Sequence, residues 1–254
     1  MSLPNALTIA GFDPSGGAGV LADARTFAAF GYRPSAVITS ITFQNDQQAT
    51  GAVHQTATAV RGQVDSLLAQ FQFACAKTGM LATREVVLEV ARILRQSELP
   101  ALVVDPVMVS SSGMRLLEEY ALEVVTAELF PLARLVTPNI PEAEALSGLK
   151  ITSEAKMREA ATIIRGMGAR AVLIKGGHLG GQKAEVSEAI DVLDDEGTVT
   201  VFRAQFIRGA NIRGSGCMLS AAIAAGLGKG MSLEDAVREA KGFVLKELRR
   251  GFAT

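Results

Sequence analysis

Short apolar runs, several of them rich in β-branched residues, alternate along the chain with longer stretches in which apolar residues recur at helical spacing. In residues 19–30, for example, Leu21, Ala24 and Phe27 fall on one face of a helix. Strands are predicted at residues 6–10, 36–42, 73–77, 101–105, 135–137, 171–175, 190–193 and 199–202. Helices are predicted at residues 19–30, 60–70, 85–95, 116–132, 142–146, 154–167, 217–227 and 233–248.

This alternation indicates an α/β protein built from βαβ units, with a mainly parallel sheet covered by helices on both faces. The last two strands are separated by the acidic turn at residues 194–197, and they are predicted to form a hairpin at the sheet edge. Ser232 is the predicted N-cap of the final helix. Because we find no Pro-, Gly- or Ser-rich linker, repeat or low-complexity tract, residues 1–254 are predicted to form a single domain.

Composition narrows the class of protein. A hydrophobic content of 48% with 20% charged residues indicates a globular chain with a sizeable core. The 25 basic and 26 acidic residues nearly cancel, which gives no support to nucleic-acid binding. No apolar run reaches the length of a membrane span, and no Lys or Arg precedes Arg25, so neither a membrane helix nor a secretory signal is expected. Two distant cysteines, Cys75 and Cys217, match no metal spacing, and we expect a cytoplasmic protein.

The segment Gly214-Ser215-Gly216-Cys217 precedes a run of small apolar residues that predicts a buried helix. Unpaired N–H groups and a partial positive charge make a helix N-terminus a binding site for anions. The same field would stabilise a thiolate at Cys217. On this segment alone, a second interpretation stays open, in which two glycines merely start a packed helix.

Polar and glycine residues follow most of the predicted strands. They lie at residues 11–19, 42–45, 78–80, 105–108, 137–139 and 175–178. Because the carboxyl ends of parallel strands meet at one edge of a sheet, these loops predict a composite binding site. The first loop lacks the Gly-Lys-Ser/Thr ending of a P-loop and the glycine spacing of a dinucleotide fingerprint, so those two nucleotide-binding classes are not favoured.

Taken together, the loop motifs resemble the ribokinase-like superfamily, and within it the hydroxymethylpyrimidine/phosphomethylpyrimidine kinases of thiamine biosynthesis. The matching segments occur in the family's order: AGFDPSGGAG (10–19), AD (22–23), TFQN (42–45), KTGM (77–80), DPVMV (105–109), TPNIPEAE (137–144), KGGH (175–178) and GSGC (214–217). They span nearly the whole chain, and a cysteine where most of the superfamily has aspartate is specific to this branch. The resemblance implies a three-layer α/β/α sandwich with a mainly parallel central sheet, a homodimer, and ATP with Mg²⁺ as co-substrate and cofactor.

The resemblance also implies roles for particular residues. Cys217 would accept the proton of the substrate hydroxyl, while Gly214, Ser215 and Gly216 would bind the transferred phosphoryl group. The residues implied for ATP are Asn139 and Lys175 at the phosphates, and Glu142 and Asp105 at the metal. Those implied for the pyrimidine are Gly11, Asp23, Gln44, Met80 and Val107.

The residue types by themselves leave plainer interpretations open. Asp23 could be a solvated charge, and Met80 a filler of the core. Glu142 could merely complement the dipole of a helix start, and Lys175 could extend its ammonium group to water from a strand end. Cys75, inside an apolar strand, is interpreted as a core thiol.

Several positions depart from the family's usual residues. Phe12 replaces a serine in the first loop, and Ser111 lies where a lysine is common. Arg208 and Gly209 replace Asp-Thr before the glycine-rich loop. Ile212 and Arg213 also depart from the family's residues before the loop, Ser215 departs within it, and Met218 departs directly after the cysteine. Two other functions therefore stay open: a pyridoxal-type vitamin kinase, and a catalytically weak protein that binds such a vitamer. Whether one or both phosphorylation steps are catalysed also stays open.

Overall fold

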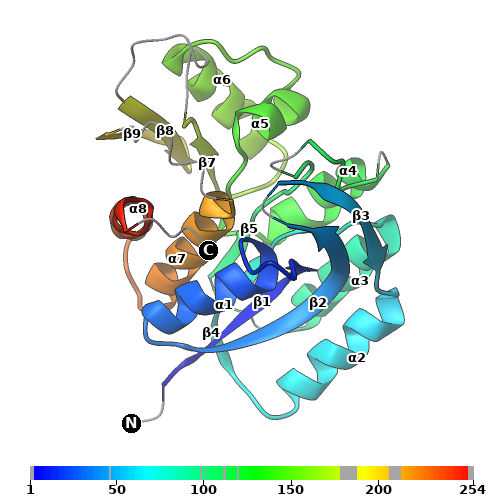
Figure 1. Ribbon diagram of the computed structural model, residues 1–254. Coiled ribbons are helices and arrows are strands. Elements are labelled where there is room, and N and C mark those ends of the chain that lie inside the picture. The colour runs from blue at the N-terminus through cyan, green and yellow to red at the C-terminus, as the bar shows by residue number, and fades with distance from the viewer. Residues whose placement is uncertain are drawn as a thin grey trace.

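The computed structural model describes residues 3–45, 47–97, 99, 101–110, 113–118, 120–177, 188–205 and 213–250. In this part of the chain the strands form one nine-stranded sheet in the order β3-β2-β1-β4-β5-β6-β7-β8-β9 (Figure 1). The strands are β1 (Asn5–Phe12), β2 (Arg33–Gln44), β3 (Ala49–His54), β4 (Phe73–Thr78), β5 (Leu102–Val104), β6 (Leu135–Val136), β7 (Ala171–Lys175), β8 (Glu188–Asp195) and β9 (Thr198–Gln205). The pairs from β2 to β7 are parallel, whereas β3, β8 and β9 run antiparallel to their neighbours at the two edges.

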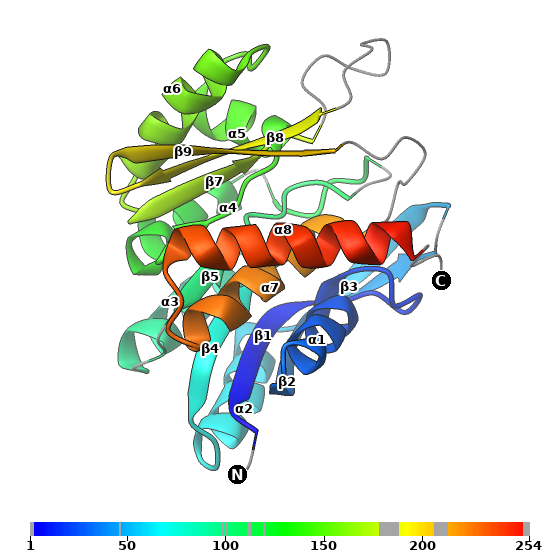
Figure 2. The ribbon, with the colours of Figure 1, turned by 90° about the vertical axis from the view of Figure 1, so that its left-hand side faces the viewer.

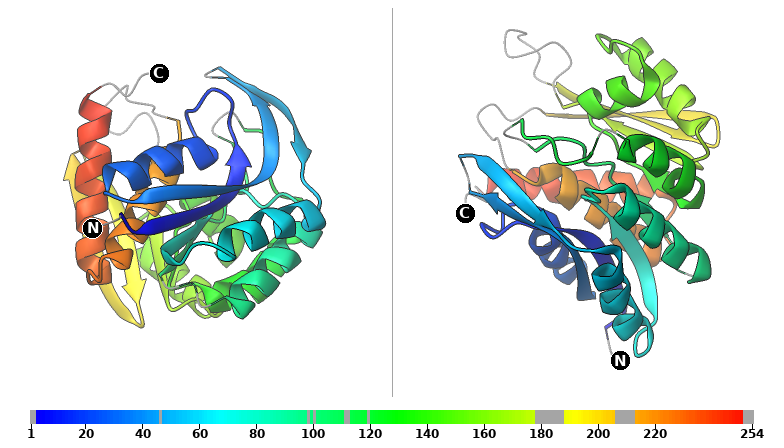
Figure 3. Two further views of the ribbon diagram at one scale, coloured as in Figure 1. Left: turned by 90° about the horizontal axis from the view of Figure 1, so that it is seen from below. Right: turned by 90° about the vertical axis from the view of Figure 1, so that its right-hand side faces the viewer.

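Helices cover both faces of the sheet, as the alternation of elements predicts. One layer holds α1 (Gly19–Ala29), α7 (Ser215–Gly228) and α8 (Leu233–Arg249). The opposite layer holds α2 (Ala57–Leu68), α3 (Arg84–Gln96), α4 (Ala121–Val124), α5 (Ile140–Ser147) and α6 (Glu154–Arg165). Helix α8 lies across α7 in Figure 2, and Figure 3 shows the sheet between the two helix layers. The architecture is the predicted three-layer α/β/α sandwich.

The innermost helix of the first layer is apolar on every side. Its residues 218–226 are all buried, among them Leu219, Ile223 and a series of alanines. A helix that is hydrophobic all round is buried all round, and α7 accordingly lies between the sheet and α8. Helix α8 has only one apolar face, and the side chain of Ser232 accepts a hydrogen bond from the backbone of Asp235, which confirms the predicted N-cap.

Two predictions of local structure are wrong. Strand β3 is absent from the predicted strands. The segment contains Gly51 and alternates weakly between apolar and polar residues, and its hydrogen bonds to β2 stabilise the strand. The helix predicted from residue 116 begins only at Ala121 and continues through a π-helical turn (Val125–Leu129) and a 3₁₀ turn (Phe130–Leu132). Before it, the backbone N–H of Leu116 donates to the carbonyl of Met108, so this segment folds back on the loop after β5.

No helix in the described ranges is both long and apolar enough to cross a membrane. The hairpin of β8 and β9 forms at the sheet edge as predicted. The carboxyl ends of β1, β4, β5, β6 and β7 face the start of α7, and this arrangement places the polar loops of the sequence together.

Candidate active site

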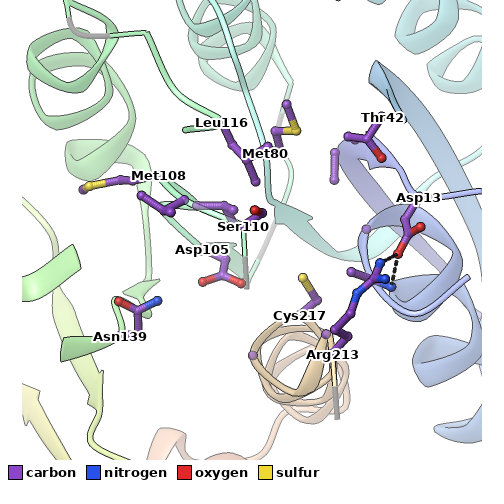
Figure 4. Close-up of a pocket in the computed structure, with 18 of the residues that line it drawn as sticks. Asp13, Thr42, Met80, Asp105, Met108, Ser110, Leu116, Asn139, Arg213 and Cys217 are labelled. Atoms are coloured by element: carbon purple, nitrogen blue, oxygen red, sulfur yellow. Dashed lines mark hydrogen bonds and ion pairs between the residues drawn. The ribbon is translucent and has the colours of Figure 1, made fainter. Parts of the chain in front are cut away.

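A cavity of about 530 Å³ opens where the parallel strands end and α7 begins. It brings together every predicted site residue except Asp23. These residues are Gly11, Gln44, Met80, Asp105, Val107, Asn139, Glu142, Lys175, Gly214, Ser215, Gly216 and Cys217. In Figure 4, Asp105 and Cys217 lie between Asn139 on one side and Asp13 with Arg213 on the other.

The two glycine-rich loops of the chain contact each other directly. Gly214, the residue before α7, has φ +75°, and a Cβ there would lie 2.1 Å from the carbonyl oxygen of Gly17. Gly19 has φ +60°, and a Cβ there would lie 2.1 Å from the carbonyl oxygen of Gly11. Only glycine fits at these two positions, since both the left-handed conformation and the close backbone approach exclude a side chain.

The first residues of α7 line the cavity, and the N–H groups of a helix start have no partner within the helix. Met218 is the first residue of this loop whose N–H donates within the helix, to the carbonyl of Gly214. The N–H groups of Ser215 and Gly216 precede this first bond, and both residues line the cavity. Their geometry fits the predicted anion site.

Arg213 joins the two loops through a carboxylate. Its guanidinium donates to Oδ2 of Asp13 at 2.6 Å and to the hydroxyl of Ser15 at 3.2 Å. Asp13 is almost fully buried, and it also accepts backbone N–H bonds from Ser15 at 2.9 Å and Ala18 at 2.9 Å. The arginine that departs from the family's usual residue therefore holds the first loop against the start of α7. The departures at Arg208, Gly209, Ile212 and Ser111 lie outside the described residues, as does His178.

Cys217 lies in the first turn of α7 and is partly exposed to the cavity. Burial raises the pKa of its thiol, and the positive charge of Lys77 is the main opposing influence. Desolvation thus opposes the thiolate that the helix terminus is expected to stabilise, and this expectation stays a prediction. Cys75 is fully buried in the core, and burial raises its pKa to about 12, as expected for a structural thiol.

Asp105 and Lys175 form an ion pair at the floor of the cavity. The Nζ atom of Lys175 donates to Oδ1 of Asp105 at 2.7 Å, and the other oxygen accepts from the hydroxyl of Ser220 at 3.2 Å. Burial alone would raise the pKa of Asp105, but the charges of Lys175 and Lys77 outweigh it and lower the pKa. Both groups therefore stay charged beside the position predicted for phosphates.

Asn139 and Glu142 form a capping box at the start of α5. The Asn139 side chain accepts from the Glu142 N–H at 2.9 Å, and Oε2 of Glu142 accepts from the Asn139 N–H at 2.8 Å. The plainer interpretation of Glu142 is thus correct, but it is not the whole account, because the carboxylate also lines the cavity. Burial is the main cause that raises the pKa of Glu142 to about 7, against the opposing charge of Lys175.

The four predicted pyrimidine contacts that reach the cavity are Gly11, Gln44, Met80 and Val107. A Cβ at Gly11 would lie 3.0 Å from the sulfur of Met80, so the absence of a side chain at Gly11 leaves room for the methionine. Asp23, by contrast, is fully buried on α1 and does not line the cavity. Its carboxylate accepts hydrogen bonds from Lys77 and Thr8, so the expectation that Asp23 contacts the pyrimidine is corrected.

Sequence reasoning gave no role to several residues that line the cavity. They include Asp13, Thr42, Lys77 and Leu116. Lys77 carried a usable signal, since it is the one charge in the apolar strand 73–78 and a buried lysine requires a partner. Leu116 carried none, because it reaches the cavity only through the fold-back of residues 113–118.

A three-layer α/β/α sandwich with a glycine-rich helix start at a cavity beside the strand ends is typical of small-molecule kinases of the ribokinase-like class. A sequence model of the family described as phosphomethylpyrimidine kinase matches residues 13–254. The hydroxymethylpyrimidine/phosphomethylpyrimidine kinase of Streptomyces coelicolor is 41% identical over 249 residues, which cover 98% of this chain and 90% of that protein. The chain belongs to the phosphomethylpyrimidine kinase family.

Solved structures agree with this assignment of fold. A phosphomethylpyrimidine kinase from Clostridium difficile 630 superposes with a TM-score of 0.83 at 36% identity, covering 96% of this chain and 99% of that one. A pyridoxal kinase from Staphylococcus aureus in complex with ADP superposes with a TM-score of 0.89 at 32% identity, covering 100% of this chain and 91% of that one. The fold is therefore shared by kinases of two different substrates, and the fold alone does not determine which substrate a chain binds.

Proposed function

We propose that this protein transfers the terminal phosphoryl group of ATP to 4-amino-5-hydroxymethyl-2-methylpyrimidine, and to its monophosphate, in thiamine biosynthesis. The observation that carries the proposal is that one cavity holds both Cys217 with the glycine-rich start of α7 and the pocket of Gln44, Met80 and Val107. A hydroxymethyl group on a ring in that pocket would face the sulfur and the anion site together.

The residues of the chain have distinct tasks in this reaction. The hydroxyl oxygen of the substrate attacks the γ-phosphorus of ATP, ADP leaves, and the hydroxyl proton passes to the sulfur of Cys217. The N–H groups of Ser215 and Gly216 stabilise the oxygens of the transferred group. Lys175, paired with Asp105 at 2.7 Å, is placed to exchange this carboxylate for a phosphate oxygen when ATP binds. The proton transfer requires Cys217 as a thiolate.

We propose that Mg²⁺ enters with ATP, with Glu142 and Asp105 as the nearest carboxylates and Asn139 beside them. The fit rests on Glu142, a buried carboxyl whose pKa of about 7 would fall beside a cation. Among the described residues no group of three or more His, Cys, Asp or Glu side chains could hold a metal by itself, which agrees with an ion held mainly by phosphates and water. When bound, the ion would neutralise charge on the phosphates.

Both the polar and the apolar side chains of the pocket favour a pyrimidine substrate. The amide of Gln44 can both donate to and accept from an aminopyrimidine edge, and Met80 and Val107 provide apolar walls. A site built to hydrogen-bond a substrate rejects analogues that leave its polar groups unpaired. Phe12 also lines the cavity, and its ring would narrow the pocket or replace one wall by stacking on the substrate.

The test is kcat/KM with ATP for the hydroxymethylpyrimidine and for pyridoxal, in the native protein and in Phe12→Ser. We expect a native preference for the pyrimidine, and a preference for pyridoxal would overturn the assignment. Tight binding of one vitamer without turnover of either would instead support the catalytically weak binding protein. Recovery of turnover in Phe12→Ser would identify the Phe12 ring as the cause of such a loss.

We further propose a cytoplasmic homodimer that pairs through the face of β2 and β3. Ile41, Phe43 and Val53 are 40%, 51% and 52% exposed, and Ile41 lies opposite Val53 in the ladder. Exposed apolar side chains on an edge ribbon favour association. Light scattering on the native protein and on Phe43→Ser tests this, and a native monomer would contradict it.

A further inference from the structure

The carboxylate of Asp191 binds the backbone at the end of β7. Asp191 is almost fully buried and lies on β8 opposite Lys175, the last residue of β7. Its Oδ1 atom accepts a hydrogen bond from the backbone N–H of Gly176 at 2.8 Å, and its Oδ2 atom accepts one from the ammonium group of Lys241 on α8. A buried carboxylate is costly unless it is paired, and both oxygens of this one have partners. The side chain of Asp191 thus joins α8 to the residue that follows Lys175.

Two further contacts hold the backbone around Lys175. The N–H of Lys175 donates to the carbonyl of Pro138 at 2.8 Å, just after β6. A Cβ at Gly176 would lie 1.7 Å from the carbonyl oxygen of Ile190 on β8, so the chain after Lys175 packs directly on the backbone of β8. Together with Asp191, these contacts fix the point at which the side chain of Lys175 leaves the sheet.

The ammonium group of Lys175 lies between Asp105 and the start of α7. Its Nζ atom is 2.7 Å from Oδ1 of Asp105, and a Cβ at Gly216 would lie 3.2 Å from the same nitrogen. Lys175 therefore contacts both the carboxylate and the glycine-rich helix start. Because a lysine side chain is long and flexible, the position of its charge depends on the backbone that carries it.

We propose that Asp191 is a positioning residue, which holds the backbone of Lys175 so that the ammonium group meets the phosphates of ATP, and that Lys241 keeps Asp191 in place. The inference rests on the proposed function for the binding of ATP by Lys175. Asp191 and Lys241, both in the described part of the chain, do not line the cavity, so they act through Lys175. Small displacements caused by residues remote from the chemistry are sufficient to weaken a site of this kind.

The other end of β8 provides a matched control. Asp194 is also almost fully buried, and its Oδ1 atom accepts from the N–H of Gly197 in the hairpin turn at 2.9 Å. Nε of Arg165, the last residue of α6, lies 2.9 Å from the same oxygen. These three described residues do not line the cavity either. The same strand thus carries a second buried carboxylate that binds a glycine N–H and a helix cation, at a distance from the candidate site.

The test compares two double variants that both remove the ion pair. Asp191→Asn/Lys241→Met keeps an oxygen that can accept from Gly176, whereas Asp191→Leu/Lys241→Met does not. Calorimetry measures the Kd of a non-hydrolysable ATP analogue with Mg²⁺, and the Kd of the hydroxymethylpyrimidine. In the leucine variant we expect the Kd of the analogue to rise about tenfold, as for one weakened hydrogen bond to a charged group, and the Kd of the pyrimidine to stay unchanged. The asparagine variant should bind both ligands like the parent, and Asp194→Leu/Arg165→Met should lower Tm without changing either Kd.

The two double variants match in charge and nearly in size, so a difference between them measures the bond to the Gly176 N–H. Equal Kd values for the ATP analogue in the two variants overturn the proposal. Equal weakening of both ligands in the leucine variant also overturns it, because it would show a general loosening of the site. If the leucine variant does not fold, Asp191→Asn/Lys241→Met is compared with Lys241→Met, which leaves a buried carboxylate unpaired.

In that comparison, weaker binding of the analogue in the single variant than in the double variant supports the proposal, and equal or tighter binding overturns it. The binding measurements need no turnover. A native protein that binds the analogue but transfers no phosphoryl group would therefore overturn the proposed function, while the comparison of variants still decides this inference.

Discussion

Gly214→Ala should abolish most of the activity while leaving the protein folded. Two separate effects act at this position. The backbone has φ +75°, a conformation that costs an L-residue about 1–2 kcal/mol. The new Cβ would also lie 2.1 Å from the carbonyl oxygen of Gly17, and because that atom is backbone it cannot rotate away.

The magnitude of the second effect follows from the geometry. Non-bonded carbon and oxygen atoms need roughly 3 Å or more, so the two glycine-rich loops must separate by about 1 Å. A displacement of about 1 Å at a catalytic site lowers the rate by roughly 10²-fold. The start of α7 binds the transferred phosphoryl group in the proposed reaction, and we expect kcat/KM to fall by at least this factor.

Gly230→Ala is the matched control. Gly230 has φ +80°, but a Cβ there would meet nothing within 4 Å. Both variants should lose about 1–2 kcal/mol of stability, or a few degrees in Tm for each kcal/mol, from the conformation alone. Only Gly214→Ala should lose activity. Thermal melts and steady-state kinetics measure the two quantities, and near-native kcat/KM in folded Gly214→Ala would refute the argument.

Two further predictions concern the reacting groups. Cys217→Ala should lower kcat by about 10²–10⁴-fold, while calorimetry should show that substrate binding is kept. Cys75→Ala should affect only the stability of the protein. Near-native turnover in Cys217→Ala would contradict the role of Cys217 as proton acceptor. Glu142, with a pKa of about 7, becomes neutral as the pH falls below 7, so the Mg²⁺ concentration for half-maximal activity should rise in acid. Glu142→Gln should raise this concentration about tenfold at pH 8 and flatten its pH dependence, and an unchanged titration would contradict the metal role.

Much of the candidate site can be predicted from the local sequence. Polar and glycine residues directly after buried strands predict a composite cavity, because parallel strands end at one edge of the sheet. Asn139 and Glu142 have the spacing of a capping box, and the structure contains that capping box. Gly214 and Gly216 before an apolar run predict a helix start, and α7 begins at Ser215. These features depend on neighbours a few residues apart, which a sequence displays directly.

The sequence by itself thus determined the alternation of strands and helices apart from β3, the covering of the sheet on both faces and most of the loops that build the cavity. Only the tertiary structure decided how the buried charges pair. Lys77 and Asp23 are 54 residues apart, and Lys175 and Asp105 are 70 apart. It also decided that Cys217 is partly desolvated, and that Asp23 binds Lys77 and Thr8 instead of lining the cavity. Burial and Coulomb energy depend on distances between segments that only the folded chain brings together, and so no local pattern encodes them.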